Sequence, residues 1–166
     1  MLINSELKKE YPWGDAEWKK RTEILANIIP AGVSVLDIGG GLCNLNKYLS
    51  DCKYISLDLK CWTNLTFEAD FNKGQYPDVG KYQYLVCQGI LEYMENPEDF
   101  LNRIKKYGNR LILTYLYRPK GQMEMHRNNN MDFDELAKLF EKAGWTKQMQ
   151  RLMTTNHRIF YLSKNV

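Results

Sequence analysis

The chain has 166 residues, of which 44% are hydrophobic and 26% charged, and its formal net charge is +3. This length and composition are typical of one globular domain with a hydrophobic core. The weak positive charge gives no reason to expect nucleic acid or an anionic membrane as a partner, and no stretch is apolar for long enough to cross a bilayer. The opening residues MLINSELKKE lack the apolar core of a secretory signal. We therefore expect a single cytoplasmic domain over residues 1–166.

The first half of the chain alternates predicted helices and strands. A helix begins after Asp15, which suits an N-cap, and is stopped by Pro30 and Gly32. Short apolar, β-branched segments predict strands, and a short helix follows the glycines after the first of them. The predicted strands are 33–38, 53–58 and 65–70, and the short helix is 44–51.

The second half continues the alternation and ends in a hairpin. Asn96, Pro97 and the acidic residues after them predict the start of a helix, which Gly108 ends. Asp132 and Glu135 form a capping pair for a further helix. The predicted strands are 82–88 and 110–117, and two alternating segments, 146–153 and 158–163, are joined by TTNH as an antiparallel hairpin.

This alternation predicts an α/β fold, a doubly wound and mostly parallel sheet with helices on both faces and a C-terminal antiparallel hairpin. In such sheets a ligand binds outside the carboxyl ends of the strands, at the point where the strand order reverses. The residues that directly follow each strand are therefore the site candidates, namely Gly39–Gly41, Asp58, Asp70, Gln88–Tyr93 and Tyr115–Arg118.

The four cysteines form no CxxC pair, and the chain has two histidines to accompany them. Zinc sites need clustered cysteine and histidine ligands at short spacings. The sequence therefore predicts no metal site. We expect the cysteines to act mostly as small apolar side chains; they are Cys43, Cys52, Cys61 and Cys87.

The segment SVLDIGGGLCNL (34–45) joins a buried strand to a bare glycine turn. Glycine permits positive φ and a close approach of a ligand to the backbone. Dinucleotide-binding sites have the motif G-x-G-x-x-G, and in this chain Asn44 occupies the position of the third glycine. Asp58, 19 residues after Gly39, suits the ribose hydroxyls of a dinucleotide or of S-adenosylmethionine. The turn and Asp58 leave both cofactors open.

Asp37 separates these alternatives. It stands at the mouth of the turn, where a carboxylate would repel a pyrophosphate but suit the sulfonium and ammonium groups of S-adenosylmethionine. Asp70, at the end of the third predicted strand, can accept a hydrogen bond from an adenine amine. Both carboxylates favour S-adenosylmethionine over NAD.

In order and spacing, these segments resemble the motifs of class I S-adenosylmethionine-dependent methyltransferases over about residues 15–163. VLDIGGGLCNL resembles the glycine motif, ISLDL the ribose motif and EADF the adenine motif, while YLVCQGILEYMENPEDFL and MDFDELAKLFEKAGW resemble later segments. The resemblance implies a Rossmann-like fold, S-adenosylmethionine as cofactor and S-adenosylhomocysteine as product. The implied cofactor-binding residues are Asp37, Gly39, Gly41, Asp58, Leu59, Asp70, Phe71 and Gln88.

The chain departs from the family pattern in three places. Cys43 replaces the third glycine of the motif, where its side chain is expected to narrow the cofactor pocket. Only a few residues join the second predicted strand to the third, so the helix expected there is missing or one turn long. Glu92-Tyr93 stands where the family often has Glu-His, which removes one candidate base.

The acceptor side is less specified. Residues 1–30 are expected to form an N-terminal helical lid, and the polar segment 117–132 a substrate-facing loop. The catalytic residue is unassigned, with His126, Tyr93 and Glu92 as candidates. The residues expected to face the substrate are Tyr11, Trp13, Tyr93, Tyr115, Arg118 and Arg127.

The sequence thus predicts a methyltransferase (EC 2.1.1 type) that acts on a small molecule such as a sugar, a glycan precursor or a similar metabolite. The alternative is a methyltransferase-like protein that binds the cofactor or a partner without catalysis. Methylation of nucleic acid bases is not favoured, because Asn/Asp-Pro-Pro-Tyr does not follow the fourth strand. The role of Arg21 stays open: its side chain could bond to the methionine carboxylate of the cofactor, or it could lie on a solvated helix face. The oligomeric state also stays open.

Overall fold

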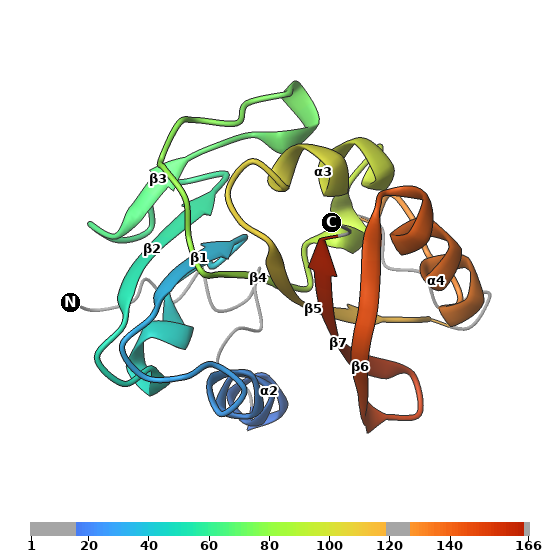
Figure 1. Ribbon diagram of the computed structural model, residues 1–166, viewed down its shortest axis with the longest axis horizontal. Helices are drawn as coiled ribbons and strands as arrows, with labels where there is room; N and C mark the ends of the chain where they lie inside the picture. Colours follow the sequence, from blue (N-terminus) through green and yellow to red (C-terminus); the bar gives the residue numbers. More distant parts are fainter. Residues whose placement is uncertain (1–15, 119–126, 165–166) are drawn as a thin grey trace.

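The computed structural model describes residues 16–118 and 127–164 (Figure 1). Within these ranges, the strands form one sheet in the order β3-β2-β1-β4-β5-β7-β6. The strands are β1 Ser34–Ile38, β2 Lys53–Asp58, β3 Thr66–Glu68, β4 Tyr84–Gln88, β5 Arg110–Leu116, β6 Trp145–Thr154 and β7 His157–Lys164. The helices are α2 Ala16–Ala26, α3 Pro97–Ile104 and α4 Phe133–Lys142, and the 3-10 segments are η1 Asn44–Tyr48, η2 Phe71–Lys73 and η3 Leu91–Tyr93.

The sheet is parallel from β3 to β5 and antiparallel beyond β5. The first strand, β1, pairs in parallel with β2 on one side and with β4 on the other. In contrast, β7 runs antiparallel to both β5 and β6. The strand order therefore reverses between β1 and β4, which places the expected ligand site outside the carboxyl ends of these two strands. The predicted fold class is confirmed, including the closing hairpin.

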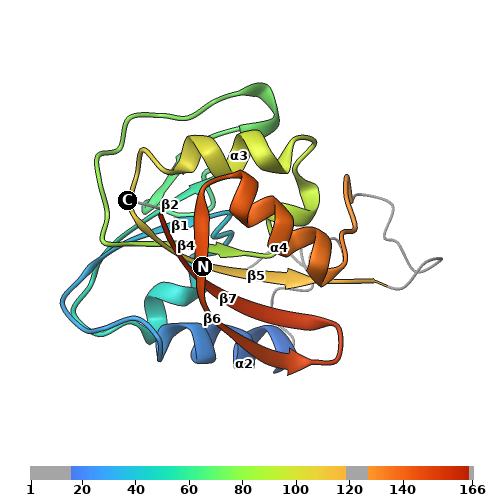
Figure 2. The same ribbon diagram turned by 45° about the vertical axis from the view of Figure 1, so that its right-hand side comes forward.

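Two hydrophobic cores lie on opposite faces of the sheet. Figure 2 shows α3 and α4 on one face and α2 on the other. Alternate residues of β1 divide between them, because successive side chains of a strand point to opposite faces. Leu36 and Ile38 join the core under α3 and α4, whereas Val35 joins the core under α2. Asp37 shares the face of Val35 and is fully buried, so a carboxyl group enters this layer directly before the glycine turn.

The helices α3 and α4 begin where the sequence predicts. Asn96 Oδ1 accepts a hydrogen bond from the Asp99 backbone N–H at 3.0 Å, and Pro97 occupies the first turn. At α4, Asp132 Oδ1 accepts from the Glu135 N–H at 2.8 Å, and Glu135 Oε2 accepts from the Asp132 N–H at 2.8 Å. Both predictions are confirmed because the bonds that start these helices are local in sequence.

The chain is less helical between β1 and β4 than the alternation predicts. The predicted helix 44–51 is the short 3-10 segment η1, in which Leu45 is buried but Tyr48 is 37% exposed. Residues 59–65, between β2 and β3, contain no helix. A crossover helix usually needs about a dozen or more residues, and this link is shorter. The expectation of a missing or one-turn helix is therefore confirmed here.

Candidate functional site

The glycine turn after β1 leaves no room for side chains. Gly39 and Gly41 adopt positive φ angles of 76° and 51°. A Cβ atom at Gly39 would lie 2.8 Å from Cδ1 of Ile90, and one at Gly40 would lie 2.5 Å from Oγ of Ser56. Contacts this short are not tolerated, so the turn presents bare backbone at the carboxyl end of β1.

Asp37 lies beneath this turn and not at its mouth. Its Oδ2 accepts a hydrogen bond from the Tyr54 hydroxyl at 2.7 Å and would lie 2.8 Å from a Cβ atom at Gly40. Burial raises the pKa of Asp37 to about 7, against the lowering effect of the Tyr54 hydroxyl. Near neutral pH the carboxyl is therefore divided between its charged and neutral forms. Asp37 is 0% exposed, so an effect on a bound cation would act through the turn and not by direct contact.

Asp58, at the end of β2, is bonded to the glycine turn. The Gly41 N–H donates to Asp58 Oδ2 at 2.9 Å, and the indole N–H of Trp62 donates to Oδ1 at 3.0 Å. A carboxylate has about four acceptor positions, so both oxygens can accept further bonds. Leu59, the next residue, is 57% exposed and offers an apolar surface beside the carboxylate. Trp62 was not predicted as a site residue, because its bond to Asp58 depends on the path of the short loop after β2.

Asp70 and Phe71, both expected beside an adenine ring, differ in their placement. Asp70 accepts a hydrogen bond from the Lys73 backbone N–H at 3.3 Å and caps η2, and its side chain remains 19% exposed. Phe71 is 7% exposed, and its ring centroid lies 5.2 Å from that of Tyr76 and 5.4 Å from that of Phe100. The structure therefore corrects the expectation for the Phe71 ring, which packs in the core under α3.

A cavity opens at the glycine turn, between α2 and η1. On the α2 side, the Arg21 guanidinium stacks 3.7 Å from the ring centroid of Trp18. Gln88, at the end of β4, also lines the cavity, and its Oε1 lies 3.2 Å from the hydroxyl of Thr22. The cavity is lined by Trp18, Arg21, Thr22, Gly39, Gly40, Gly41, Leu42, Asn44, Leu45 and Gln88. Three of the residues expected to bind the cofactor, Gly39, Gly41 and Gln88, are thus brought together at one cavity.

Cys43 does not line this cavity. Its backbone is left-handed, with φ 54° and ψ 36°, which gives a physical reason for glycine at this motif position. Its Sγ lies 3.2 Å from the hydroxyl of Thr63 and 3.4 Å from that of Thr66, and the residue is 4% exposed. The cavity is lined instead by the residues on either side, Leu42 and Asn44. The expected narrowing of the pocket by Cys43 is therefore not seen.

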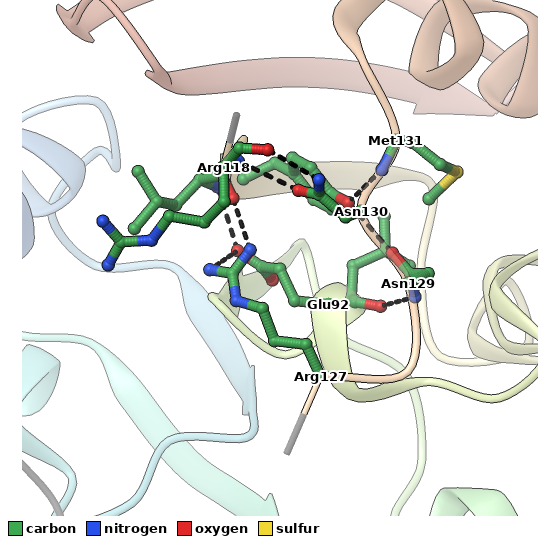
Figure 3. A network of polar contacts seen from close by, with 9 residues as sticks. Glu92, Arg118, Arg127, Asn129, Asn130 and Met131 are labelled. Carbon is green, nitrogen blue, oxygen red and sulfur yellow. Dashed lines mark hydrogen bonds and ion pairs between the residues drawn. The ribbon is translucent and has the colours of Figure 1, made fainter. Parts of the chain in front are cut away.

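A polar network joins the turn after β4 to the segment that follows β5 (Figure 3). Glu92 is 1% exposed, and its Oε1 accepts a hydrogen bond from the Leu116 backbone N–H at 2.9 Å. Arg127 Nη2 lies 3.8 Å from the same oxygen, and Arg127 Nη1 donates to the Leu116 carbonyl at 2.6 Å. Burial raises the pKa of Glu92, and these bonds oppose the rise. Glu92 therefore has the contacts of a structural acid.

Two asparagines extend this network across the turn. Asn129 Nδ2 donates to the carbonyls of Leu91 and Met94 at 2.8 and 3.0 Å, and its Oδ1 accepts from the Tyr115 hydroxyl at 2.9 Å. Asn130 is bonded twice to the backbone of Arg118, as an acceptor at 2.9 Å and as a donor at 2.6 Å. These bonds hold the described part of the expected substrate-facing loop against the sheet end.

The residues expected to face a substrate separate into groups. Tyr115 is 0% exposed and Arg127 is 7% exposed, and both are held in the network. The structure therefore corrects the expectation that these two side chains contact a substrate directly. Tyr93 is 38% exposed, and Arg118 is partly exposed at the end of β5, so both stay candidates. The expected residues Tyr11, Trp13 and His126, and the expected N-cap Asp15, lie outside the described residues.

His157, the first residue of β7, was not predicted as a site residue. It pairs with Leu116 across the sheet. Burial lowers the pKa of His157 to about 4, helped by the positive charges of Arg21, Arg127 and Arg118. The imidazole is therefore neutral near pH 7. Nothing in the local sequence signals this, because the three arginines come from α2 and from two separate points after β5.

In the part of the chain that the structure describes, no three His, Cys, Asp or Glu side chains are grouped so that they could hold a metal ion. A search of the same residues finds no helix with the length and apolar character needed to cross a membrane.

Comparison of the sequence with protein-family models and with curated proteins finds no match. The fold, however, is similar to those of solved methyltransferases. Burkholderia thailandensis 1,6-didemethyltoxoflavin-N1-methyltransferase, with bound 1,6-didemethyltoxoflavin and S-adenosylhomocysteine, has a TM-score of 0.77 at 14% identity, over 98% of this chain and 84% of that one. An S-adenosylmethionine-dependent methyltransferase from Aquifex aeolicus has a TM-score of 0.73 at 15% identity, over 98% of both chains. This chain therefore has the class I methyltransferase fold, as the sequence resemblance predicts.

The same fold also occurs in a protein with another activity. The [4+2]-cyclase SpnF has a TM-score of 0.72 at 11% identity, over 90% of this chain and 81% of that one. A shared fold does not fix the reaction, so the function of this chain has to be argued from its own residues.

Proposed function

We propose that this protein transfers a methyl group from S-adenosylmethionine to a small-molecule acceptor. The observation that carries the proposal is the 2.9 Å hydrogen bond between the Gly41 N–H and Asp58. This bond joins the bare glycine turn to the acid of the neighbouring strand, at the point where the strand order reverses. An open backbone beside a carboxylate is the environment that a nucleoside with free ribose hydroxyls needs.

The described residues fit the separate parts of this cofactor. Asp58 keeps acceptor positions for ribose hydroxyls, and the exposed Leu59 offers an apolar face to an adenine ring. The Asp70 carboxylate is 19% exposed and paired with Lys73 Nζ at 3.0 Å, and it would accept the adenine amine beside that lysine. The backbone of Gly39–Gly41 and the Gln88 amide would meet the methionine half. When bound, the cofactor supplies an activated methyl group, which passes to a lone pair of the acceptor while the carbon–sulfur bond breaks and S-adenosylhomocysteine is left.

The chain's own contribution on the acceptor side is alignment and exclusion of water. A base is needed only where the acceptor atom must lose a proton, and the Oε1 atom of the buried Glu92 is bonded within the fold. We propose that residues 1–30 and 117–132 border the acceptor within a single domain. The wall that Trp18 and Arg21 form at the cavity, and the position of Arg118 after β5, support this.

Isothermal titration calorimetry with S-adenosylmethionine and S-adenosylhomocysteine tests the proposal. We expect both to bind with one-to-one stoichiometry, and a folded protein that binds neither would refute it. A screen of small-molecule acceptors with methyl-labelled cofactor then separates the proposal from its alternative. Labelled product supports catalysis, whereas tight cofactor binding without transfer to any acceptor supports a methyltransferase-like binding protein.

A further inference from the structure

The strand β6 forms one edge of the sheet and is largely open to solvent. In Figure 1 it is the last strand on the side of α4, because the strand order ends in β5-β7-β6. Within the described residues, its neighbour in the sheet is β7 alone. Residues 146–152 of β6 are all exposed. An edge strand of this kind keeps a row of backbone N–H and C=O groups with which a further strand can pair.

The outer row of β6 on the α2 face of the sheet combines apolar and cationic side chains. Residues that pair across an antiparallel ladder share a face. Met149 pairs with Tyr161 and Arg151 pairs with Ile159, and both of these β7 residues pack in the core under α2. Met149 is 46% exposed, whereas Met153 is half-buried against the same core. The row therefore places an arginine between two methionines.

The hairpin of β6 and β7 carries positive charge without an acid of its own. Between residues 145 and 164 the chain has four Lys or Arg and no Asp or Glu. The four are Lys147, Arg151, Arg158 and Lys164. Within residues 16–118 and 127–164, no acid lies within ion-pair distance of the Arg151 guanidinium. This guanidinium is exposed and can therefore bind the carboxylate of a partner.

The same edge disfavours pairing with a second copy of this chain. The register with β7 shifts between Lys147 and Met149 and again between Leu152 and Thr154, so the regular stretch is residues 149–152. Two copies paired at this edge would bring the cationic side chains of one strand against those of the other. Like charges on paired strands are destabilising, and bulges limit the length over which a further strand can pair. Charge and register therefore favour a short partner segment of opposite charge.

We propose that the edge of β6 binds an extended acidic segment of another protein, which adds to the sheet as a further strand. The segment would pair with the backbone of residues 149–152. On the α2 face it would carry an acidic side chain opposite Arg151, with apolar side chains toward Met149 and Met153. Three strands, β4, β5 and β7, separate this edge from β1. The partner would therefore bind without covering the proposed cofactor site, and the inference is independent of the proposed function.

The test is a two-dimensional ¹H–¹⁵N NMR titration of the full chain with matched synthetic peptides. One peptide has the core Val-Thr-Glu-Thr-Val and the other Val-Thr-Lys-Thr-Val, each with blocked ends. We expect the glutamate peptide to cause saturable shifts of the backbone amides of residues 149–152, and the lysine peptide to bind at least about tenfold more weakly. A glutamate peptide that is N-methylated throughout its core should not bind, because it has no N–H groups to donate to the strand.

Matched variants locate the binding surface. Arg151→Glu should reverse the preference, so that the lysine peptide binds at least about tenfold more tightly than the glutamate peptide. Lys53→Glu makes the same change in net charge at the exposed start of β2, and its affinity for the glutamate peptide should stay within about twofold of wild type. If Arg151→Glu fails to fold, Arg151→Gln takes its place and should abolish the preference between the two peptides.

Three results would overturn the inference: no saturable shifts with the glutamate peptide, equal affinity for the two charged peptides, or undiminished binding of the N-methylated peptide. Two further measurements address other occupants of this edge. Dimerisation that rises with protein concentration and shifts the amides of residues 149–152 would assign the edge to a second copy. Binding to phosphatidylserine vesicles without binding to the glutamate peptide would assign it to an anionic membrane. Either result also contradicts the proposed partner.

Discussion

At the scale of single residues, the carboxyl of Asp37 is the group whose environment differs most from the one its sequence position suggests. It lies under the glycine turn with the Tyr54 hydroxyl as donor, and its pKa rises from 3.8 to about 7. The folded protein therefore binds a proton more tightly than the unfolded chain between these values. The contribution of Asp37 to the free energy of unfolding must then fall as the pH rises from about 4 to 7, by about 4 kcal/mol at most.

Asp37→Asn removes the cost of ionising a buried carboxyl group and keeps an oxygen to accept the Tyr54 hydrogen bond. We expect the variant to be more stable than wild type by about 2–4 kcal/mol at pH 8, and the difference to vanish toward pH 4. Urea unfolding of both proteins at several pH values measures this. Glu92 also has a raised pKa, but it is common to both proteins and cancels in the difference. If the free energies of unfolding of wild type and Asp37→Asn changed in parallel from pH 4 to 8, the charged form of Asp37 would carry no cost in stability.

Cys43 offers a second prediction at this scale. Its left-handed backbone costs about 1–2 kcal/mol in a residue with a Cβ atom, while its buried Sγ contacts Thr63 and Thr66. Cys43→Gly relieves the strain and loses the contacts, so we expect a net change in stability below about 1 kcal/mol. The affinity for S-adenosylhomocysteine should stay within about twofold, because the side chain does not line the cavity.

Cys43→Ala is the matched control for this change, since it loses the sulfur contacts but keeps the strain. It should be less stable than Cys43→Gly in urea unfolding. Calorimetry tests the predicted affinity for S-adenosylhomocysteine. A clear gain in this affinity for Cys43→Gly would mean that the thiol does crowd the site.

At the scale of elements, the segment after β5 is held by side chains that bond to backbone. Asn129 satisfies the carbonyls of Leu91 and Met94 and the hydroxyl of Tyr115, so it replaces three backbone or water partners at once. Asn129→Ala removes one hydrogen bond from each of these groups in a partly buried place, although the Leu91 carbonyl keeps the Met94 N–H and the Tyr115 hydroxyl keeps the Met131 N–H. We expect a loss of about 2–3 kcal/mol in the free energy of unfolding.

The neighbouring Asn128 provides the control. It is exposed, and its side chain makes one hydrogen bond, to the Tyr93 carbonyl. Asn128→Ala should cost below about 1 kcal/mol. Hydrogen exchange followed by mass spectrometry should also show faster exchange at residues 91–94 in Asn129→Ala alone. Equal effects of the two variants would mean that the segment is held by something other than the Asn129 amide.

The same elements explain how far the sequence predicts the fold. Local signals sufficed for α3 and α4, because Asn96 and Asp132 form their capping bonds within three residues. They failed for η1, where Tyr48 has helical spacing but no buried surface to cover. They also failed for the run of asparagines at 128–130, which resembles a polar loop because the backbone partners of Asn128 and Asn129 lie 35 or more residues away and that of Asn130 lies 12 residues away.

The candidate site follows the same division. The glycine turn, Asp58 and Gln88 could be found because each ends or directly follows a strand. The other expected site residues were wrong where the side chain is buried, because the position of a residue near a strand end does not show whether its side chain is buried. Phe71 and Tyr115 also lie at or near strand ends, yet both side chains are covered. The position of His157 opposite Leu116 needed the sheet itself, because β5 and β7 become neighbours only through the strand order.

At the scale of the whole molecule, the sheet connects the proposed cofactor site to both cores. A ligand bound at the carboxyl ends of β1 and β2 contacts strands that carry α2 on one face and α3 with α4 on the other (Figure 2). Binding should therefore stabilise the complete fold. At a hundredfold excess over the dissociation constant the gain is about 2.7 kcal/mol, which for a domain of this size is several degrees in melting temperature.

Asp58→Asn should abolish this shift. The carboxylate accepts from two N–H donors, Gly41 and Trp62, and an amide has a single oxygen to offer them. The variant should therefore lose about 1–3 kcal/mol without ligand and gain nothing from S-adenosylhomocysteine. Glu68→Gln, an exposed change at the end of the neighbouring strand, should keep the wild-type shift. Thermal unfolding with and without ligand measures both, and an undiminished shift in Asp58→Asn would place the ribose away from β2.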